Sequence, residues 1–478
     1  MRKKNIVLFC LFSLSIAVGF AQIDSAANLT LDNCITIAIK NNLDVKSSKL
    51  DTKSSKLNFK QSLNQLLPNL NGNYNIGVNN GRSIDPFTNT YSNSEFTFSN
   101  FGMNLNLTLF NGFNALNRIK RDKFNLRAAE MEQEETIQNL IIDVTVAYIR
   151  ILNSRDMLAL IEARMEVTER QLERLEDNYN EGVGNPANYT NMQGQYASDK
   201  VALLNAQNTL EAAIISFSRL LNLEVETEAQ IQYLSGLFEP QVYGLSVSQV
   251  YQDALENLAT FKARQYRIDA AKSNIKVARS NYYPQISVFS RLNTNYSSLA
   301  ETFTETGTST VETGNFVTID NQDYPVLQNK TQFTGNKISY EDQFENNLST
   351  VVGLSVQIPL FNRFQARNNV KLQKIQLEDS KIQLESTKLS FKQAIEQAYI
   401  SMETAYSVYN TLTEQVKAYE ESFRINEVRF NNDVSNIVDY IISKNNVDSA
   451  KLNLNQAKYE YVLRVKILDY YRGEMSLN

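Results

Sequence analysis

The sequence predicts a mainly α-helical chain that also supplies strands to a membrane β-barrel. Three observations lead to this fold class: an internal duplication, apolar residues spaced in heptads over long stretches, and short stretches in which apolar and polar residues alternate. The 478 residues include only 7 prolines and 16 glycines, as expected for long uninterrupted elements.

The composition argues against an enzyme. Histidine is absent, which removes the usual general base, the common nucleophile pairs and the commonest metal ligand. Lys and Arg number 47 against 52 Asp and Glu, a net charge of −5 that disfavours nucleic acid as a partner. No phosphate-binding glycine motif and no nucleophile elbow occurs. We therefore expect no catalytic residues, no cofactor and no metal site.

The first 21 residues have the pattern of an export signal. A basic stretch, Arg2–Lys4, precedes an apolar stretch, Ile6–Phe20, and small residues precede an expected mature start at Gln22. The apolar stretch is too short for a retained helix, which needs about 20 apolar residues. Cys34 is then the single cysteine, so no internal disulfide is expected. No later stretch is apolar enough for a membrane-spanning helix, so an exported chain of this kind is either soluble outside the cytoplasm or a β-barrel.

Two segments recur at one fixed spacing, which predicts the duplication. Leu107–Phe113 matches Ile358–Phe364, and Tyr179–Asn185 matches Phe430–Asn436, each pair lying 251 residues apart. Because the intervening stretches are equally long, both copies are expected to arrange their elements alike.

The second copy carries an insertion. Leu67–Leu70 matches Tyr283–Ile286 at a spacing of only 216 residues, so the second copy has 35 additional residues. We place them in 297–347, where Thr, Asn, Gly and Glu predominate and predict a long loop. The chain is thus divided into a first repeat over 22–223, an inter-repeat linker over 224–244 and a second repeat over 245–478.

Heptad spacing predicts long coiled-coil helices in both repeats. Apolar residues lie seven apart from Ile137 to Tyr179 and, in the same register, from Ile395 to Phe430. The helix from Phe113 to Tyr179 spans 67 residues, or about 100 Å at the usual rise. We further expect returning helices over 189–222 and 440–471, and an opening helix in each repeat over 29–66 and 245–282.

Alternation next to these helices predicts strands whose apolar side chains face lipid. The expected lipid-facing residues are Phe101, Met103, Leu105, Leu107 and Leu109 in the first repeat, and Val352, Leu354, Val356, Ile358 and Leu360 in the second. Polar residues such as Asn104 and Asn106 interleave with them, which is typical of a membrane barrel wall. A strand of a soluble sandwich also alternates, but the fusion to helices of about 100 Å favours the barrel.

Over nearly the whole mature chain, the sequence resembles the TolC-like outer-membrane efflux channel family. The resemblance lies in the duplicated order of elements: a helix, Leu67–Leu70, a hairpin, Leu107–Phe113, a long helix, a turn and a second helix. The resemblance implies a homotrimer in the outer membrane, in which each protomer adds four strands to one 12-stranded barrel and the helices form a tapering periplasmic tunnel. It also implies a periplasmic adaptor and an inner-membrane pump, of RND or ABC type, and passive export of drugs, toxic compounds, metal ions or secreted proteins. The strands support oligomerisation independently, because four strands cannot close a barrel and open edges in lipid leave backbone groups unpaired.

The resemblance also implies that the turn between the two long helices of each repeat contacts the adaptor. The candidate residues are Gly182, Val183 and Gly184 in the first repeat and Asp433, Val434 and Ser435 in the second. The alternative is that the glycines only supply the left-handed cap that a sharp turn needs.

The family pattern places a ring of acidic residues near the closed end of the tunnel, and Asp439 is the candidate gate residue. The second acidic position of the pattern is occupied by Ile442, and the first repeat has Asn188 where the second has Asp439. The alternative is that Asp439 only complements the dipole at the start of its helix.

Two further functions stay open at this point. The chain could be a coiled-coil scaffold without a pore, or a surface adhesin that binds through 297–347, although the alternating strands disfavour the scaffold. The acidic run Glu130–Glu135 is interpreted as a solvated helix face rather than a metal cluster. The exported substrate cannot be predicted, because the inner-membrane partner usually selects it.

Overall fold

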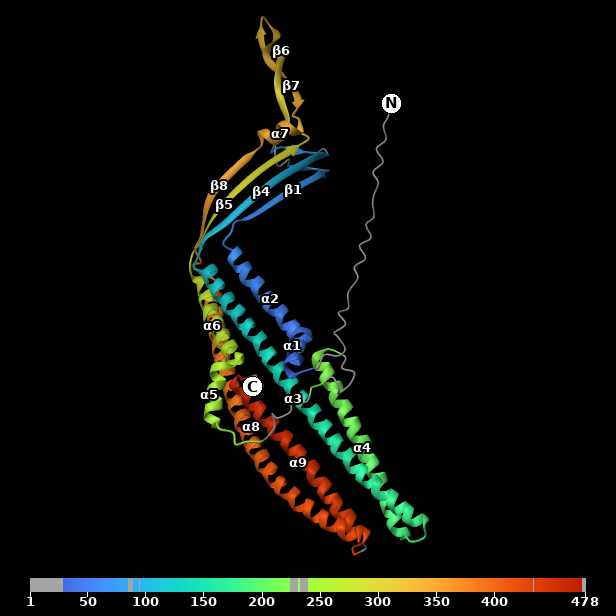
Figure 1. Ribbon diagram of the computed structural model, residues 1–478. Coiled ribbons are helices and arrows are strands. Elements are labelled where there is room, and N and C mark those ends of the chain that lie inside the picture. Colours follow the sequence, from blue (N-terminus) through green and yellow to red (C-terminus); the bar gives the residue numbers. More distant parts are fainter. Residues whose placement is uncertain are drawn as a thin grey trace, which may run out of the picture. The chain divides into compact units, whose positions relative to one another are not determined.

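The structure is a computed structural model that describes residues 29–84, 89–93, 95–223, 231–232, 240–432 and 434–474 (Figure 1). The predicted export signal and most of the linker 224–244 lie outside the described residues. The chain divides into two compact units. Unit 1 comprises Met1–Asp51, Met131–Lys262 and Ser386–Asn478, and unit 2 comprises Thr52–Glu130 and Ala263–Glu385.

Four long helices have matching lengths in the two repeats. Helices α3 (Asn114–Asn180) and α8 (Gln365–Asn431) both have 67 residues, whereas α4 (Pro186–Leu221) and α9 (Ile437–Arg472) both have 36. Asn185 and Asn436 cap α4 and α9, because each side-chain oxygen accepts a backbone N–H of the first helical turn. The long helices predicted from heptad spacing are confirmed.

The prediction of a single opening helix in each repeat is wrong, because the structure has two consecutive helices in each place. In the first repeat, α1 (Leu31–Asn41) is followed by α2 (Leu43–Asn64), and in the second, α5 (Val247–Asn257) by α6 (Ala259–Arg279) and a short 3₁₀ turn. Asn42 causes the first break, since its side-chain oxygen accepts the N–H groups of Asp44 at 2.8 Å and Val45 at 3.1 Å. At the second break, Leu258 has extended backbone angles and a buried side chain.

The core of unit 1 is formed where these short helices pack on the long ones. Helix α1 packs on α4, and α5 packs on α9. The Tyr148 hydroxyl donates to the carbonyl of Gln232 at 2.6 Å, and its ring packs edge-on against Phe217 at 6.0 Å. Burial raises the pKa of Tyr148. Among the described helices, none has an 18-residue stretch apolar enough to cross a membrane.

Unit 2 contains a four-stranded antiparallel sheet. The strands are β1 (Asn69–Asn79), β4 (Phe96–Asn111), β5 (Gln285–Ser297) and β8 (Ser349–Gln357), in the order β1-β4-β5-β8. The hairpins of the two repeats therefore join through their β4 and β5 strands, while β1 and β8 form the edges. Two short strands, β2 (Ser83–Ile84) and β3 (Tyr91–Ser92), pair within the connection from β1 to β4.

Three of the predicted lipid-facing residues depart from the expected alternation. Leu109 is the extra residue of a bulge between Thr108 and Phe110, so Phe110 pairs with Ile286 in its place. Ile358 and Leu360 lie beyond the end of β8 at Gln357. Pro359 explains this ending, because proline has no N–H to donate to the neighbouring strand.

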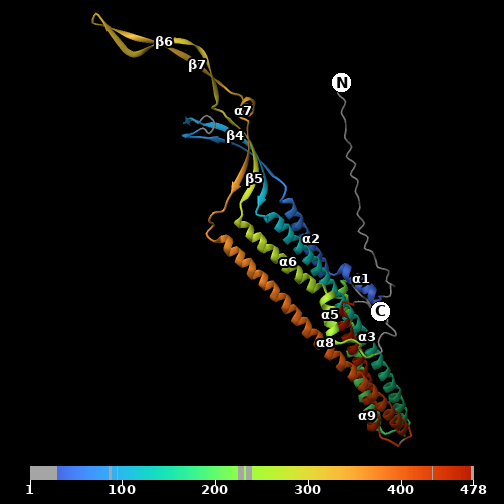
Figure 2. The ribbon, with the colours of Figure 1, turned by 90° about the vertical axis from the view of Figure 1, so that its left-hand side faces the viewer.

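The prediction of a long loop over 297–347 is also wrong. Figure 2 shows that this segment forms a two-stranded ribbon of β6 (Glu301–Ile319) and β7 (Gln322–Lys337), followed by the short helix α7 (Tyr340–Asn346). Its many threonines were counted among the loop-forming residues, but threonine is β-branched and favours strands. Asp320 and Asn321 have φ angles of 55° and 65°, which are the left-handed values that a two-residue hairpin turn requires.

Candidate functional site

One face of the four-stranded sheet is apolar. Residues that pair directly in an antiparallel sheet lie on the same face, and Leu107 of β4 pairs with Val288 of β5, which pairs with Leu354 of β8. The following predicted lipid-facing residues share that face: Phe101, Met103, Leu105, Leu107, Val352, Leu354 and Val356. Val352 is 70% exposed and Leu354 61% exposed, so the face has no cover over these residues in the single chain.

The opposite face is lined with amide side chains. The asparagines on it are Asn69, Asn71, Asn73, Asn75, Asn79, Asn100, Asn104, Asn106, Asn111, Asn293 and Asn295. Asn75 donates to the side-chain oxygen of Asn100 across the β1–β4 pair at 3.0 Å. The sheet thus separates an apolar surface from a polar one.

The turn between α3 and α4 depends on its two glycines. Gly182 has φ 76°, a left-handed value, and its N–H donates to the Tyr179 carbonyl at 3.1 Å. The Gly184 N–H donates to the Asn178 carbonyl at 2.8 Å, and a Cβ on Gly184 would lie only 2.8 Å from that backbone. Val183 between them is 78% exposed. The capping role of the glycines therefore holds, and it presents an exposed valine at the turn.

The turn between α8 and α9 is built differently. Asp433 lies outside the described residues. The Val434 N–H donates to the Arg429 carbonyl at 2.9 Å, and the Val434 side chain is 66% exposed. The Ser435 hydroxyl donates to the Asp439 carboxylate at 3.4 Å.

Asp439 lies in the first turn of α9 with its side chain exposed. Its N–H donates to the side-chain oxygen of Asn436, the N-terminal cap of α9, at 2.9 Å. Ile442, one turn further on, is 54% exposed. Asp439 and Ile442 therefore occupy one open face of α9, which suits either a gate contact with another protomer or a simple interaction with the helix dipole.

Next to the turns, the two helix pairs of unit 1 meet in one apolar cluster. It comprises Leu175, Met192, Phe430, Ile437 and Tyr440. The duplication reappears in its ring pairs, since Tyr179 stacks on Tyr189 at 5.4 Å and Phe430 packs on Tyr440 at 5.0 Å. Burial raises the pKa of Tyr440 to about 12.

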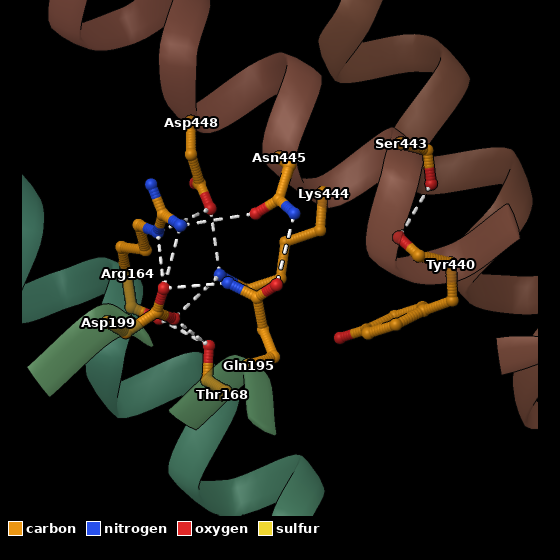
Figure 3. A network of polar contacts seen from close by, with 9 residues as sticks. All are labelled: Arg164, Thr168, Gln195, Asp199, Tyr440, Ser443, Lys444, Asn445 and Asp448. Atoms are coloured by element: carbon orange, nitrogen blue, oxygen red, sulfur yellow. Dashed lines mark hydrogen bonds and ion pairs between the residues drawn. The ribbon is translucent and has the colours of Figure 1, made fainter. Parts of the chain in front are cut away.

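Beyond this cluster, sequence reasoning missed a buried charge network, shown in Figure 3. Arg164 of α3 contacts Asp199 of α4 at 2.7 Å, and Lys444 of α9 contacts Asp448 at 2.7 Å. The two pairs are connected, because Lys444 lies 3.7 Å from Asp199 and Arg164 lies 3.6 Å from Asp448. Two cations thus face two anions.

Hydrogen bonds complete the network. Asp199 is fully buried and accepts from the Thr168 hydroxyl at 2.6 Å and from the Gln195 amide at 2.8 Å. Asn445 accepts from Arg164 at 3.2 Å and donates to Gln195 at 3.1 Å. A buried charge that is paired in this way is tolerated, whereas a buried charge without its partner is costly. The network therefore joins α3, α4 and α9 in one arrangement.

A signal for the network was present in the sequence. Met192, Asp199 and Ala206 lie seven apart, which places the carboxylate of Asp199 in the apolar seam of α4. Lys444 likewise follows Ile437 by seven residues on α9. A charged residue at such a position in a coiled coil predicts a buried partner, but it does not identify that partner.

Comparison with known proteins shows that the chain is similar to bacterial outer-membrane proteins. The outer membrane efflux protein family model matches residues 34–223 and 250–473. Outer membrane protein TolC of Salmonella enteritidis is 20% identical over 352 residues, which cover 71% of this chain and 62% of that protein. Outer membrane efflux protein BepC of Brucella suis biovar 1 (strain 1330) is 21% identical over 458 residues, which cover 95% of this chain and 87% of that protein.

The solved structures show the same fold. The CmeC outer membrane channel of Campylobacter jejuni superposes with a TM-score of 0.73 at 15% identity, covering 93% of this chain and 85% of that chain. The chain spans 62% and 59% of the length of the TolC proteins of Salmonella enteritidis and Escherichia coli (strain K12) that it matches.

The family model thus matches most of the chain, with one stretch in each predicted repeat. The predicted fold class and the outer-membrane location agree with these matches and are confirmed. The chain belongs to the outer membrane efflux protein family.

Proposed function

We propose that three copies of the chain form a passive, gated exit channel in the outer membrane, which operates with a periplasmic adaptor and an inner-membrane pump of RND or ABC type. Its cargo would be drugs, toxic compounds, metal ions or secreted proteins. The observation that carries the proposal is the sheet β1-β4-β5-β8, which has an exposed apolar face and an open edge on each side.

The open edges support a trimer. Within the described residues, β1 pairs only with β4, and β8 pairs only with β5. Each strand is antiparallel to its neighbour in the four-stranded sheet, so β1 and β8 run in opposite directions and β8 of one protomer can pair antiparallel with β1 of the next. Three protomers would supply twelve strands, an even number within the range of membrane barrels. Closure would leave no backbone group unpaired in lipid.

Aromatic residues at both ends of the sheet fit a membrane-spanning band. At the end near α7, Tyr340 packs on Tyr296 at 4.9 Å and on Phe344 at 4.5 Å. At the other end, Phe110 packs on Phe113 at 5.3 Å, and the second repeat repeats this pair with Phe361 and Phe364 at 5.4 Å. Aromatic residues favour the two interfaces of a membrane, with the apolar band between them.

The long helices support a periplasmic extension. A helix of 67 residues is about 100 Å long, whereas the hydrocarbon core of a membrane is about 30 Å thick. The exposed side chains of Val183 and Val434 at the two turns suit contact with an adaptor. In a trimer that tapers at these turns, three copies of Asp439 would approach one axis and narrow the channel.

Two measurements test the proposal. Mass measurement of the purified protein in detergent should give a trimer, recovered from the outer-membrane fraction, and the trimer should form ion-conducting channels in planar bilayers. A monodisperse monomer, or recovery from the soluble periplasmic fraction, would contradict the proposal and favour the scaffold without a pore.

A further inference from the structure

The four strands of the sheet contain one charged residue. Arg291 is the single Asp, Glu, Lys or Arg within β1, β4, β5 and β8. It lies in the middle of β5, opposite Asn104 of β4 and Val351 of β8. Its register places it on the face that carries the asparagines, away from the apolar face.

Arg291 is held over an aromatic ring. Its guanidinium carbon lies 5.1 Å from the centre of the Phe289 ring, which occupies the same face two residues earlier. Phe289 in turn covers Gly353 of β8, where an added Cβ would come within 2.6 Å of the ring. A cation over an aromatic face is attracted by the ring, and this contact restricts the side chain without removing its charge.

The charge of Arg291 is not neutralised within the described part of the chain. Its side chain is exposed and forms no ion pair there. The neighbouring asparagines are neutral, so the polar face has a positive potential at this level. Amides solvate anions and cations alike, so the arginine determines the sign of the electrostatic potential on this face.

We propose that Arg291 determines the ion preference of the channel at the level of the sheet and favours anionic cargo there. This inference rests on the proposed function, because it requires the asparagine face to line the lumen. Three copies of Arg291 would then form a ring of cations in one aqueous passage, the arrangement that anion-selective pores use. The ring would act separately from Asp439, which lies in unit 1 and carries the opposite charge.

Reversal potentials in planar bilayers under a KCl gradient test the inference. Arg291→Gln should shift the reversal potential toward cation preference, and Arg291→Lys should leave it close to that of the unmodified chain. The shift should grow as the salt is lowered from about 1 M to about 0.01 M, because the Debye length rises from about 3 Å to about 30 Å. Repeating the substitution in the Asp439→Asn chain keeps the acidic residue from masking the effect.

A second readout uses tripolyphosphate as an anionic probe. It should reduce the current of the unmodified chain and of Arg291→Lys, and it should reduce the current of Arg291→Gln much less. Lys330→Gln is the matched control, since Lys330 is an exposed cation on β7 outside the four-stranded sheet. That control should leave both the reversal potential and the tripolyphosphate block unchanged.

The outcomes separate the inference from the proposed function. Conducting channels in which Arg291→Gln changes neither the reversal potential nor the block overturn the inference and leave the exit channel intact. A change in thermal stability alone would show that Arg291 only packs on Phe289, which also overturns it. Failure of the unmodified chain to conduct ions would overturn the exit channel, and the inference with it.

Discussion

The sheet of unit 2 and the helices of unit 1 expose opposite kinds of side chain. In the sheet, Val352 and Leu354 are largely exposed on one face. In unit 1, the side chain of Asp199 is fully buried and that of Lys444 is 2% exposed. The apolar side chains of the sheet thus lie open while charges of the helices are enclosed, which reverses the usual arrangement of a soluble protein.

The difference follows from what each region contacts. In the proposed channel, the apolar face of the sheet contacts lipid, so it needs no protein cover. The charges of unit 1 are stable only because they satisfy one another across three helices. One region therefore depends on its surroundings, and the other depends on its internal pairing. The following predictions test that contrast, from the largest expected effect to the smallest.

Removing one member of the buried network should have the largest effect. Asp199→Ala leaves Arg164 and Lys444 with only Asp448 as an anion, and we expect a loss of about 3–5 kcal/mol in the free energy of unfolding. Thermal or denaturant unfolding of the purified protein measures it. The control is Lys451→Ala, which breaks the exposed pair with Glu420 and should cost less than about 1 kcal/mol. Equal losses for the two variants would show that burial of the network contributes nothing.

Introducing a charge on either face of the sheet should distinguish lipid from lumen. Leu107→Arg places the charge on the apolar face, where near the membrane midplane it should cost about 2–4 kcal/mol and reduce insertion into the outer membrane. Asn106→Arg places the same charge on the asparagine face and should be tolerated, with an altered conductance. The amount of trimer in the outer-membrane fraction is the measurement. Equal tolerance of both substitutions would remove the distinction between the two faces.

The α3–α4 turn should be sensitive to a single methyl group. Gly182→Ala forces alanine into a left-handed conformation at φ 76°, and we expect a loss of about 1–2 kcal/mol in thermal unfolding. Gly194→Ala is the matched control, because Gly194 lies inside α4 and, apart from its own stretch of helix, no atom is within 4 Å of the added Cβ. The control should stabilise the protein by about 0.5–1 kcal/mol. A loss in the control as well would indicate that methyl groups on these helices are generally unfavourable.

Neutralising Asp439 should have the smallest effect on stability, about 0.3–1 kcal/mol through the dipole of α9. Its effect on transport tests the gate. If three copies converge, Asp439→Asn should lower cation selectivity in planar bilayers and weaken block by multivalent cations added from the periplasmic side. Unchanged selectivity and block, with only the small loss of stability, would assign Asp439 to the helix dipole alone.

Much of this protein was predictable because periodicity is a local property of the chain. Heptad spacing predicted α3 and α8, the returning helices α4 and α9 were expected after them, and alternation predicted the long strands next to these helices. The spacing of 251 residues predicted that both repeats would have equal helices, and their lengths are indeed equal. Heptad spacing and alternation depend only on residues within a few positions along the chain, and the repeat spacing is visible by comparing the chain with itself.

Local chemistry within short segments was harder to interpret. The segment 297–347 is rich in both loop-forming and strand-forming residues, and only the pairing of β6 with β7 decided between them. The bulge in β4 leaves Leu109 without a paired residue on β5, so Phe110 occupies the paired position that alternation assigned to Leu109. Alternation along a single strand contains no information about the register of its partner.

The sequence by itself therefore determined the duplication, the long helices, the alternating strands and the resemblance to a family of exit channels. Only the tertiary structure decided that Arg164, Asp199, Lys444 and Asp448 meet, since they come from three helices and are up to 284 residues apart in the chain. It also decided that Arg291 stands alone among asparagines supplied by three different strands. The physical reason is that a charge is stabilised by whatever lies within a few ångströms of it, and that distance is set by packing rather than by position in the sequence.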